Sequence, residues 1–229
     1  MAEFDGFALK YDEALERGIA VSGEDKDFFA RGRVAHLYGL MQTLGMHPKR
    51  ILDFGCGTGS AIPHLLTLGD FVKGVDVSNA SLEVARSEFS GDRRIEFESL
   101  ESFQGHADFD LVFCNGVFHH IAIEDRDEAV GMVRRALKPG GLFAFWENNP
   151  WNPGTRLVMS RIPFDRDAIP LSPFQGKRLL QLGGFQIVRQ EFHFYFPRCL
   201  SAFRIFENAL KKVPLGAQYL ILGRNGKNR

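Results

Sequence analysis

The chain has 229 residues, and its 28 basic and 28 acidic side chains give a formal net charge of zero. This balance excludes an overall field that would attract nucleic acid or an anionic membrane. The three cysteines, Cys56, Cys114 and Cys199, lie far apart without metal-ligand spacing, which predicts a reducing compartment and no zinc or other metal site. Without a signal peptide or a long apolar run, we expect a cytoplasmic protein with no stable membrane insertion.

Strands and helices are expected to alternate through the middle of the chain, after two N-terminal helices at roughly 3–17 and 25–44. Apolar runs bounded by turn residues predict strands at 50–54, 71–76, 94–99, 109–115 and 142–147. Helical periodicity and capping residues predict helices at 60–68, 79–89 and 125–137. Such alternation is typical of a parallel sheet covered by helices on both faces.

The last third of the chain follows a different pattern. A loop rich in proline and asparagine follows residue 147, and then we expect a helix at 173–182, a long strand at 184–196, a helix at 200–212 and a strand at 217–223. No internal repeat or low-complexity linker divides the chain. We therefore expect one domain over 1–229, made of a helical cap (1–47), a ligand-binding core (48–148) and a substrate-side part (149–229).

A glycine-rich loop follows the first expected strand, where Gly55, Gly57 and Gly59 alternate with other residues. A dinucleotide-binding loop would carry glycine at the sixth place of this motif, where Ser60 stands instead. Asp53 precedes the loop, and its charge would repel a pyrophosphate but favour a cationic or hydroxyl-bearing ligand. The loop therefore predicts a nucleotide-type ligand other than a dinucleotide.

Asp76 stands at the end of the second expected strand, where a carboxylate can accept hydrogen bonds from both hydroxyls of a ribose. The simpler alternative is a tight turn followed by an aspartate that caps a helix. The order of strand, glycine loop, helix, strand and acid favours the ribose interpretation.

Four motifs in this order resemble the class I S-adenosylmethionine-dependent methyltransferases, and more narrowly the type 11 small-molecule group. The motifs are DFGCGTG at 53–59, VDVS at 75–78, FDLV at 109–112 and LKPGG at 137–141, and the resemblance covers roughly residues 48–148. It implies S-adenosylmethionine as cofactor. It also implies an α/β fold with a Rossmann-like, seven-stranded, mostly parallel sheet whose last strand is antiparallel.

The resemblance also assigns a cofactor site to residues near the ends of the first four strands. It places Gly55, Cys56, Gly57 and Asn115 at the methionine part, Asp76 at the ribose, and Val77, Glu98, Ser99 and Leu100 around the adenine. Asp53, whose charge favours a cationic or hydroxyl-bearing ligand, belongs to the same expected cofactor site. Glu98 departs from the aspartate that is commoner in the family, which leaves the register of this strand end open.

Two positions offer a candidate for a catalytic base, which the reaction needs only if the acceptor carries a proton. His119 and His120, of which we prefer His119, lie in the segment FHHI at 118–121, which follows the fourth strand at the ligand-binding edge of the sheet. Glu147 ends the fifth strand, and we expect it to point at the mouth of the pocket. The alternatives are a histidine that packs against the following loop and a carboxylate that orders its own loop.

Phenylalanine is unusually common, with 22 residues against four tyrosines, and many lie late in the chain. Phe192, Phe194 and Phe196 alternate, so we expect them to share one face of a strand. We favour a role in the core between sheet and helices, and the alternative is an apolar pocket for the acceptor.

We therefore expect an enzyme that transfers a methyl group from S-adenosylmethionine to a small, lipophilic molecule. One alternative is a non-catalytic cofactor-binding or partner subunit on the same fold. A less favoured one is an NAD(P)-dependent oxidoreductase, which the missing glycine opposes. The expected partner is the small-molecule acceptor and not a nucleic acid, and the sequence does not indicate an oligomeric state.

Overall fold

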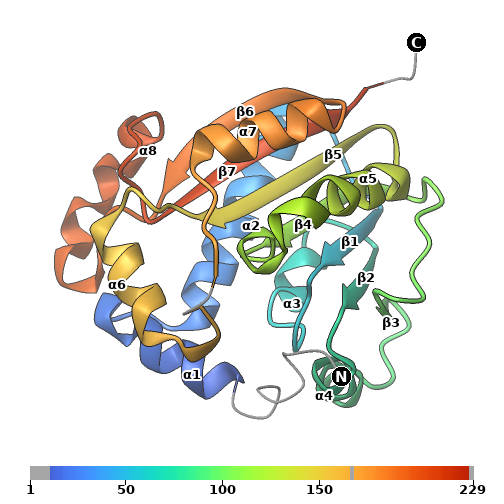
Figure 1. Cartoon of the computed structure of the whole chain (residues 1–229), viewed down its shortest axis with the longest axis horizontal. Helices are drawn as coiled ribbons and strands as arrows, with labels where there is room; N and C mark the ends of the chain where they lie inside the picture. The colour runs from blue at the N-terminus through green and yellow to red at the C-terminus, as the bar shows by residue number, and fades with distance from the viewer. Residues whose placement is uncertain (1–10, 166–167, 227–229) are drawn as a thin grey trace.

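A seven-stranded sheet with the strand order β3-β2-β1-β4-β5-β7-β6 forms the centre of the computed structural model, which describes residues 11–165 and 168–226 (Figure 1). The strands are β1 (Arg50–Phe54), β2 (Phe71–Asp76), β3 (Ile95–Ser99), β4 (Phe109–Asn115), β5 (Leu137–Asn148), β6 (Phe185–His193) and β7 (Gln218–Asn225). The first five strands are parallel, and β7 runs antiparallel to both β5 and β6. This topology confirms the expected Rossmann-like sheet with its antiparallel last strand.

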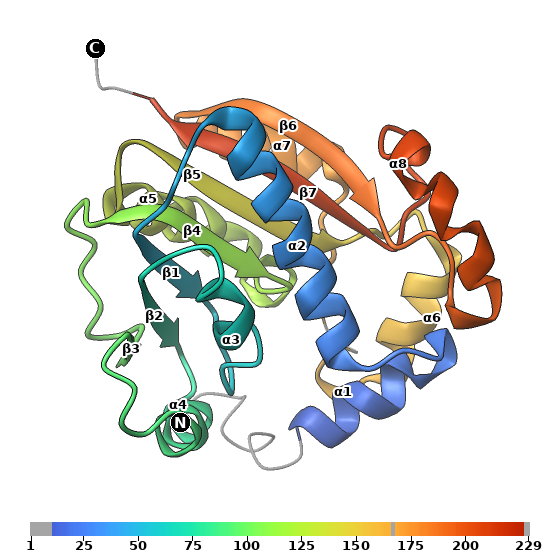
Figure 2. The same cartoon turned by 180° about the vertical axis from the view of Figure 1, so that it is seen from behind.

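Helices cover both faces of this sheet, as Figures 1 and 2 show from opposite sides. The helices with the bounds that the structure gives are α1 (Tyr11–Ile19), α2 (Lys26–Leu44), α3 (Ile62–Leu65), α4 (Asn79–Glu88), α5 (Arg126–Ala136), α6 (Pro153–Arg161), α7 (Pro173–Leu182) and α8 (Glu207–Leu210). Helices α5 and α7 lie over one face (Figure 1), and α2 and α3 lie over the other (Figure 2).

Two hydrophobic cores result, one on each face of the sheet, because side chains alternate along a strand. In β4, Val112 packs in the core beneath α5 and α7, whereas Leu111 and Phe113 pack in the core beneath α2 and α3. Both cores are apolar, so a central strand of this sheet reads as a nearly continuous hydrophobic run.

Several helices begin at the residue that their sequence predicts. Asp25 accepts a hydrogen bond from the amide of Phe28 at the start of α2, and Ser78 caps α4 in the same way. Ser172 and Gln175 form a reciprocal capping box at α7, whose first residue is a proline. These caps satisfy amides that have no partner within their own helix.

The substrate-side part differs most from expectation. Strand β6 ends at His193, earlier than predicted, because Phe194 adopts a left-handed backbone with φ of 60°. Phe192 and Phe194 therefore do not share a face: Phe192 belongs to the core beneath α7, and Phe194 packs against the opposite core. The predicted helix at 200–212 is a 3-10 helix (Arg198–Phe206) followed by the short α8.

Other bounds also shift. The expected loop after residue 147 contains α6, which Asn152 caps and whose first residue is a proline. The predicted helix at 60–68 contracts to α3 at 62–65, and α1 continues to Ile19. The part of the predicted first helix that precedes Tyr11 lies outside the described residues.

Helices α1, α6 and α8 gather beyond the end of the sheet toward which β4 and β5 point (Figures 1 and 2). Contacts between α1 and α6 join the N-terminal cap to the substrate-side part. Across 11–165 and 168–226, no helix is both long and apolar enough to cross a membrane. Helices from both ends of the chain, α1, α6 and α8, thus cover the carboxyl ends of the parallel strands, where open α/β sheets bind ligands.

Candidate cofactor and acceptor site

A cavity of about 500 Å³ lies between the carboxyl ends of the strands and the helices α1, α6 and α8. The glycine loop, Asp53 and Asn115 line one part of it, and His119, His120 and Asp165 line another. Aromatic side chains of the cap and of the segment after β6 close the cavity. A volume of this size is typical of pockets that hold small ligands.

The glycine loop provides open space at the floor of the cavity. Gly57 has a φ of +53°, and a Cβ atom built on it would meet nothing within 4 Å. Gly55 has a φ of +78°, and a Cβ atom there would come within 2.3 Å of a methyl group of Val117. The first glycine therefore allows the tight turn, and the second leaves room for a ligand against the backbone.

Backbone hydrogen bonds tie this loop to the neighbouring strand. The amides of Gly55 and Cys56 both donate to the carbonyl oxygen of Val75. The amide of Gly57 donates to one carboxylate oxygen of Asp76 at 2.8 Å, and the amide of Ser78 donates to the other at 2.9 Å. The carboxylate that the resemblance assigns to a ribose thus holds the loop, and it does not line the cavity.

Two buried oxygen atoms on the cavity wall lack hydrogen-bond partners within the described part of the chain. They are Oδ2 of Asp53 and Oδ1 of Asn115, at the ends of β1 and β4. Burial and the neighbouring Asp76 raise the pKa of Asp53 to about 7, and Arg33 partly opposes this shift. Two orphaned acceptors, one of them a carboxylate, suit a ligand that brings a cationic hydrogen-bond donor.

The residues assigned to an adenine lie at the ends of β2 and β3. Val77 is exposed, and Ser99 and Leu100 are partly buried beside it, with the Leu100 amide donating to the Asp76 carbonyl. Glu98 is turned along the sheet, where its carboxylate lies 3.0 Å from Nζ of Lys73. These four positions do not line the cavity of 500 Å³.

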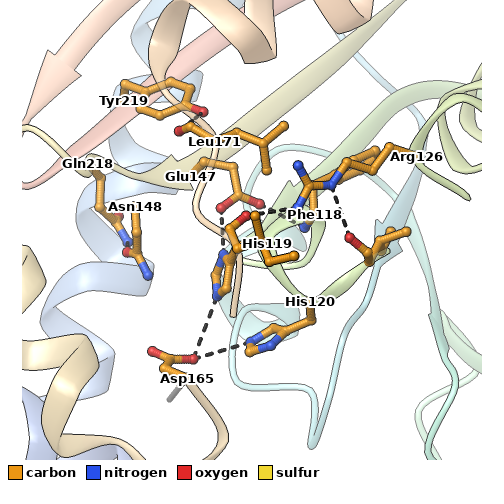
Figure 3. A network of polar contacts seen from close by, with 12 residues as sticks. Phe118, His119, His120, Arg126, Glu147, Asn148, Asp165, Leu171, Gln218 and Tyr219 are labelled. Atoms are coloured by element: carbon orange, nitrogen blue, oxygen red, sulfur yellow. Dashed lines mark hydrogen bonds and ion pairs between the residues drawn. The ribbon is translucent and has the colours of Figure 1, made fainter. Parts of the chain in front are cut away.

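His119 lies buried between two carboxylates (Figure 3). Its Nδ1 is 2.6 Å from Oε2 of Glu147, and its Nε2 is 3.6 Å from Oδ1 of Asp165. Burial disfavours the charged ring, but the Glu147 carboxylate and the hydrogen bond to Asp165 outweigh it and raise the pKa of His119 to about 10. At neutral pH the ring is therefore a cation that donates at both nitrogens.

Glu147 is fully buried and does not line the cavity, so the expectation that it points at the pocket mouth is wrong. Its carboxylate accepts from the amide of Phe118 at 2.8 Å as well as from His119 (Figure 3). Strand β5 carries Glu147 at its end, and the turn after β4 brings these two donors to it. The carboxylate thus orders the turn and fixes the His119 ring.

His120 and Asp165 complete this polar cluster. The Nε2 atom of His120 lies 3.2 Å from Oδ1 of Asp165, and both rings point toward that carboxylate in Figure 3. Burial alone would raise the pKa of Asp165, but the hydrogen bonds from His119 and His120 lower it below its usual value. Asp165 comes from the turn after α6, in a segment that the sequence pattern predicts to be a loop.

Aromatic rings form the remaining wall. Phe28 and Phe29 from α2 contact Phe194, with the ring centroids of Phe29 and Phe194 5.0 Å apart. Phe164 and Phe196 also line the cavity. Phe194 and Phe196 therefore line the cavity, whereas Phe192 lies in the core beneath α7.

The cavity wall also carries two side-chain amides and a guanidinium that are joined by hydrogen bonds and that the sequence did not assign to the site. Nη1 of Arg33 donates to Oε1 of Gln218 at 2.8 Å, and Nε2 of Gln218 donates to Oδ1 of Asn148 at 3.1 Å. All three residues line the cavity. They lie on α2, β7 and β5, so only the tertiary structure brings them together.

Comparisons with known proteins agree with this geometry. Residues 52–143 match the model of a methyltransferase-domain family. The chain is 35% identical over 108 residues to a ubiquinone biosynthesis O-methyltransferase of Idiomarina loihiensis, an alignment that covers 45% of this chain and 44% of that protein. It is 32% identical over 154 residues to the protein of the same name from Alkalilimnicola ehrlichii, covering 64% and 61%.

Among solved structures, a SAM-dependent methyltransferase from Archaeoglobus fulgidus superposes with a TM-score of 0.61 at 17% identity, covering 83% of this chain and 94% of that one. This likeness concerns the fold. The chain spans about half of the I. loihiensis relative and less than two thirds of the A. ehrlichii one. The matched segment contains the glycine loop, Asp76 and Asn115, all in the site described above. The family match over residues 52–143 and the shared fold support a class I S-adenosylmethionine-dependent methyltransferase with S-adenosylmethionine as its cofactor.

Proposed function

We propose that this protein transfers a methyl group from S-adenosylmethionine to a hydroxyl group of a small, lipophilic acceptor. One observation carries the proposal: a single cavity joins the glycine loop and its orphaned acceptors to an aromatic wall that also holds a histidine–carboxylate cluster. The O-methyltransferase relatives support an oxygen acceptor, and the phenylalanine rings support an apolar one.

The chain's own groups fit the cofactor at each of its parts. Asp53 and Asn115 would accept hydrogen bonds from its ammonium group, and the space over Gly57 would admit its methionine chain. Asp76 would accept from the ribose hydroxyls. Val77, Ser99 and Leu100, together with the stem of Glu98, would lie along the adenine, and Cys56 would contribute backbone. When bound, S-adenosylmethionine supplies a methyl group activated by its sulfonium.

The roles of the protein in the reaction are then alignment and exclusion of water. The cap and the aromatic wall enclose the acceptor, and the polar cluster marks the position of its oxygen. His119, charged and held by Glu147, donates a hydrogen bond to that oxygen or to Asp165 and orients it. We therefore assign His119 to positioning the acceptor and Glu147 to holding His119. The acceptor would lose its hydroxyl proton to solvent before the transfer, and the charged ring of His119 would favour the oxyanion that remains.

The direct test is methyl transfer by the purified chain from S-adenosylmethionine to alkylphenols of increasing chain length, with the demethylated product measured. We expect turnover that depends on the phenol, and a melting temperature that rises with S-adenosylhomocysteine but not with NADH. A melting temperature that neither S-adenosylmethionine nor S-adenosylhomocysteine changes would contradict the proposal. Cofactor binding without turnover of any hydroxylated acceptor would favour a non-catalytic subunit.

A further inference from the structure

We propose that His119, His120 and Asp165 bind a divalent transition-metal ion of the zinc class at the acceptor end of the cavity. Their ligand atoms lie within 4.8 Å of one another. Two imidazoles and one carboxylate form a donor set that suits zinc and its first-row neighbours and not magnesium or calcium.

The distances within the cluster match those between ligands of one ion. Bonds of about 2.0–2.1 Å in a tetrahedral site place neighbouring ligand atoms roughly 3.4 Å apart. Nε2 of His120 is 3.2 Å from Oδ1 of Asp165, and Nε2 of His119 is 3.6 Å from the same oxygen. The side chains thus stand close to the separations that the ion requires, and small rotations of the rings would bring them into place.

Glu147 supplies the outer partner that metal-binding histidines usually have. Such a histidine donates its second ring N–H to a carboxylate or carbonyl, and this bond fixes both the tautomer and the ring plane. Nδ1 of His119 is 2.6 Å from Oε2 of Glu147, which leaves Nε2 directed toward Asp165 (Figure 3). A metal ion at Nε2 takes the place of the proton there and releases it on binding, so that in the metal-bound protein the ion holds the acceptor oxygen in place of the His119 N–H.

The cluster opens onto the cavity, since all three side chains line it. Three protein ligands leave a fourth position for a water molecule or a substrate atom, as in catalytic zinc sites. The occupant of that position would be the acceptor oxygen, and this part of the inference rests on the proposed function. Metal binding itself does not depend on it.

A second histidine–carboxylate cluster provides a contrast. His36, Glu191 and His193 also lie within ligand distance of one another, but they do not line the cavity. Nζ of Lys211 lies 3.4 Å from Nδ1 of His36, so an ammonium group already stands beside this cluster. Repulsion from that cation opposes a metal ion there, and the cluster therefore serves as an internal control.

The test is titration of the full, metal-free chain with Co²⁺ and then Zn²⁺, without cofactor or acceptor. We expect one Co²⁺ per chain, with the intense visible absorption of a four-coordinate ion that Zn²⁺ displaces. His120→Gln and Asp165→Asn should weaken binding at least tenfold. Glu147→Gln should keep the absorption spectrum but weaken binding by about 10–100-fold. His36→Gln is the matched control and should bind as the unmodified chain does.

Absence of Co²⁺ and Zn²⁺ binding by the unmodified chain would overturn the inference, as would binding that His120→Gln and Asp165→Asn leave unchanged or that His36→Gln abolishes. Circular dichroism of each variant shows whether it folds, and His120→Gln and Asp165→Asn provide two independent chances for a folded protein. The outcome is separable from the proposed function: a chain that binds Co²⁺ but gains no stability from S-adenosylhomocysteine supports the metal site and refutes the methyltransferase proposal.

Discussion

At the cofactor end of the cavity the wall comes from Asp53, the loop at 55–57 and Asn115, at the ends of the adjacent parallel strands β1 and β4. Asp76, at the end of β2, accepts a hydrogen bond from the amide of Gly57 in this loop. At the acceptor end it comes from α2, the turn after β4, the turn after α6 and the segment after β6. The first wall follows from short motifs, because parallel strands end at the same edge of a sheet. The second depends on loops and helices whose packing no local pattern specifies.

The two ends also differ in electrostatics. Asp53 at the cofactor end has an oxygen without a partner within the described part of the chain, whereas the carboxylates of Glu147 and Asp165 at the acceptor end are hydrogen-bonded to histidines. An incomplete set of hydrogen bonds suits a site that a charged ligand completes, and a complete set suits a rigid one. The variants described next test whether the two ends of the cavity differ in this way.

The largest effect should come from the rigid end. Glu147→Ala would leave the amide of Phe118 and the charged ring of His119 buried without their acceptor. We expect a loss of about 3–5 kcal/mol in the free energy of unfolding, measured with urea. Glu128→Ala, on the exposed side of α5, is the control and should change it by less than about 0.5 kcal/mol. Equal stabilities of the two variants would show that the acceptor end does not rely on this network.

Asp76→Ala should have the next largest effect, on cofactor affinity. Hydrogen bonds from ribose hydroxyls to a carboxylate contribute about 2–3 kcal/mol, so the Kd of S-adenosylhomocysteine should rise roughly a hundredfold by calorimetry. Asp92→Ala provides a matched control, because Asp92 is paired with Arg94 at the surface. An unchanged Kd in Asp76→Ala would refute the ribose assignment and the strand-end description of this wall.

Phe196→Ala tests whether the two ends act separately. Removing this ring should raise the KM for an alkylphenol about tenfold, since buried apolar area is lost, and should leave the Kd of S-adenosylhomocysteine unchanged. Phe174→Ala on the exposed surface of α7 should change neither value. A parallel rise in the cofactor Kd would mean that the aromatic wall serves both ligands.

The smallest effect should be a pH dependence at Asp53, whose pKa is raised from 3.8 to about 7. A cationic ligand favours the carboxylate, so its binding releases a proton below pH 7, and the Kd should rise by up to about tenfold for each unit of pH lost. Above pH 7 the Kd should become constant. Asp53→Asn should flatten the calorimetric profile, and a slope that persists in this variant would assign it to another group.

The free energy of unfolding depends on pH in the opposite direction from ligand affinity. A carboxyl group whose pKa is raised by folding binds its proton more tightly in the folded protein. Its contribution is therefore complete below about pH 4 and is lost as the pH rises toward 7. The unliganded protein should lose stability over the range in which it gains affinity, and urea unfolding of the unmodified chain and of Asp53→Asn at each pH measures this difference.

Sequence patterns located β1, β2 and β4 with the bounds that the structure has, and Asp53, Asp76 and Asn115 lie at the carboxyl ends of these strands as expected. Their role in binding a cofactor stays a prediction. The same reasoning failed at Glu147, which is buried behind His119, and at Phe194, whose positive φ ends the alternation of β6. The alternation of apolar residues predicts which face of a regular strand a side chain occupies, and it makes no prediction for residues beyond the end of the strand.

The sequence alone determined the sheet and the glycine loop, because these depend on residues close together in the chain and on the common edge of parallel strands. The cofactor came from the resemblance of its motifs to those of the S-adenosylmethionine-dependent methyltransferases. Only the tertiary structure decided which groups line the rest of the cavity. Asp165 reaches His119 and His120 through the packing of α6, and Gln218 reaches Arg33 through the pairing of β7 with β5. Such contacts depend on the simultaneous burial of distant apolar faces, which no single stretch of sequence encodes.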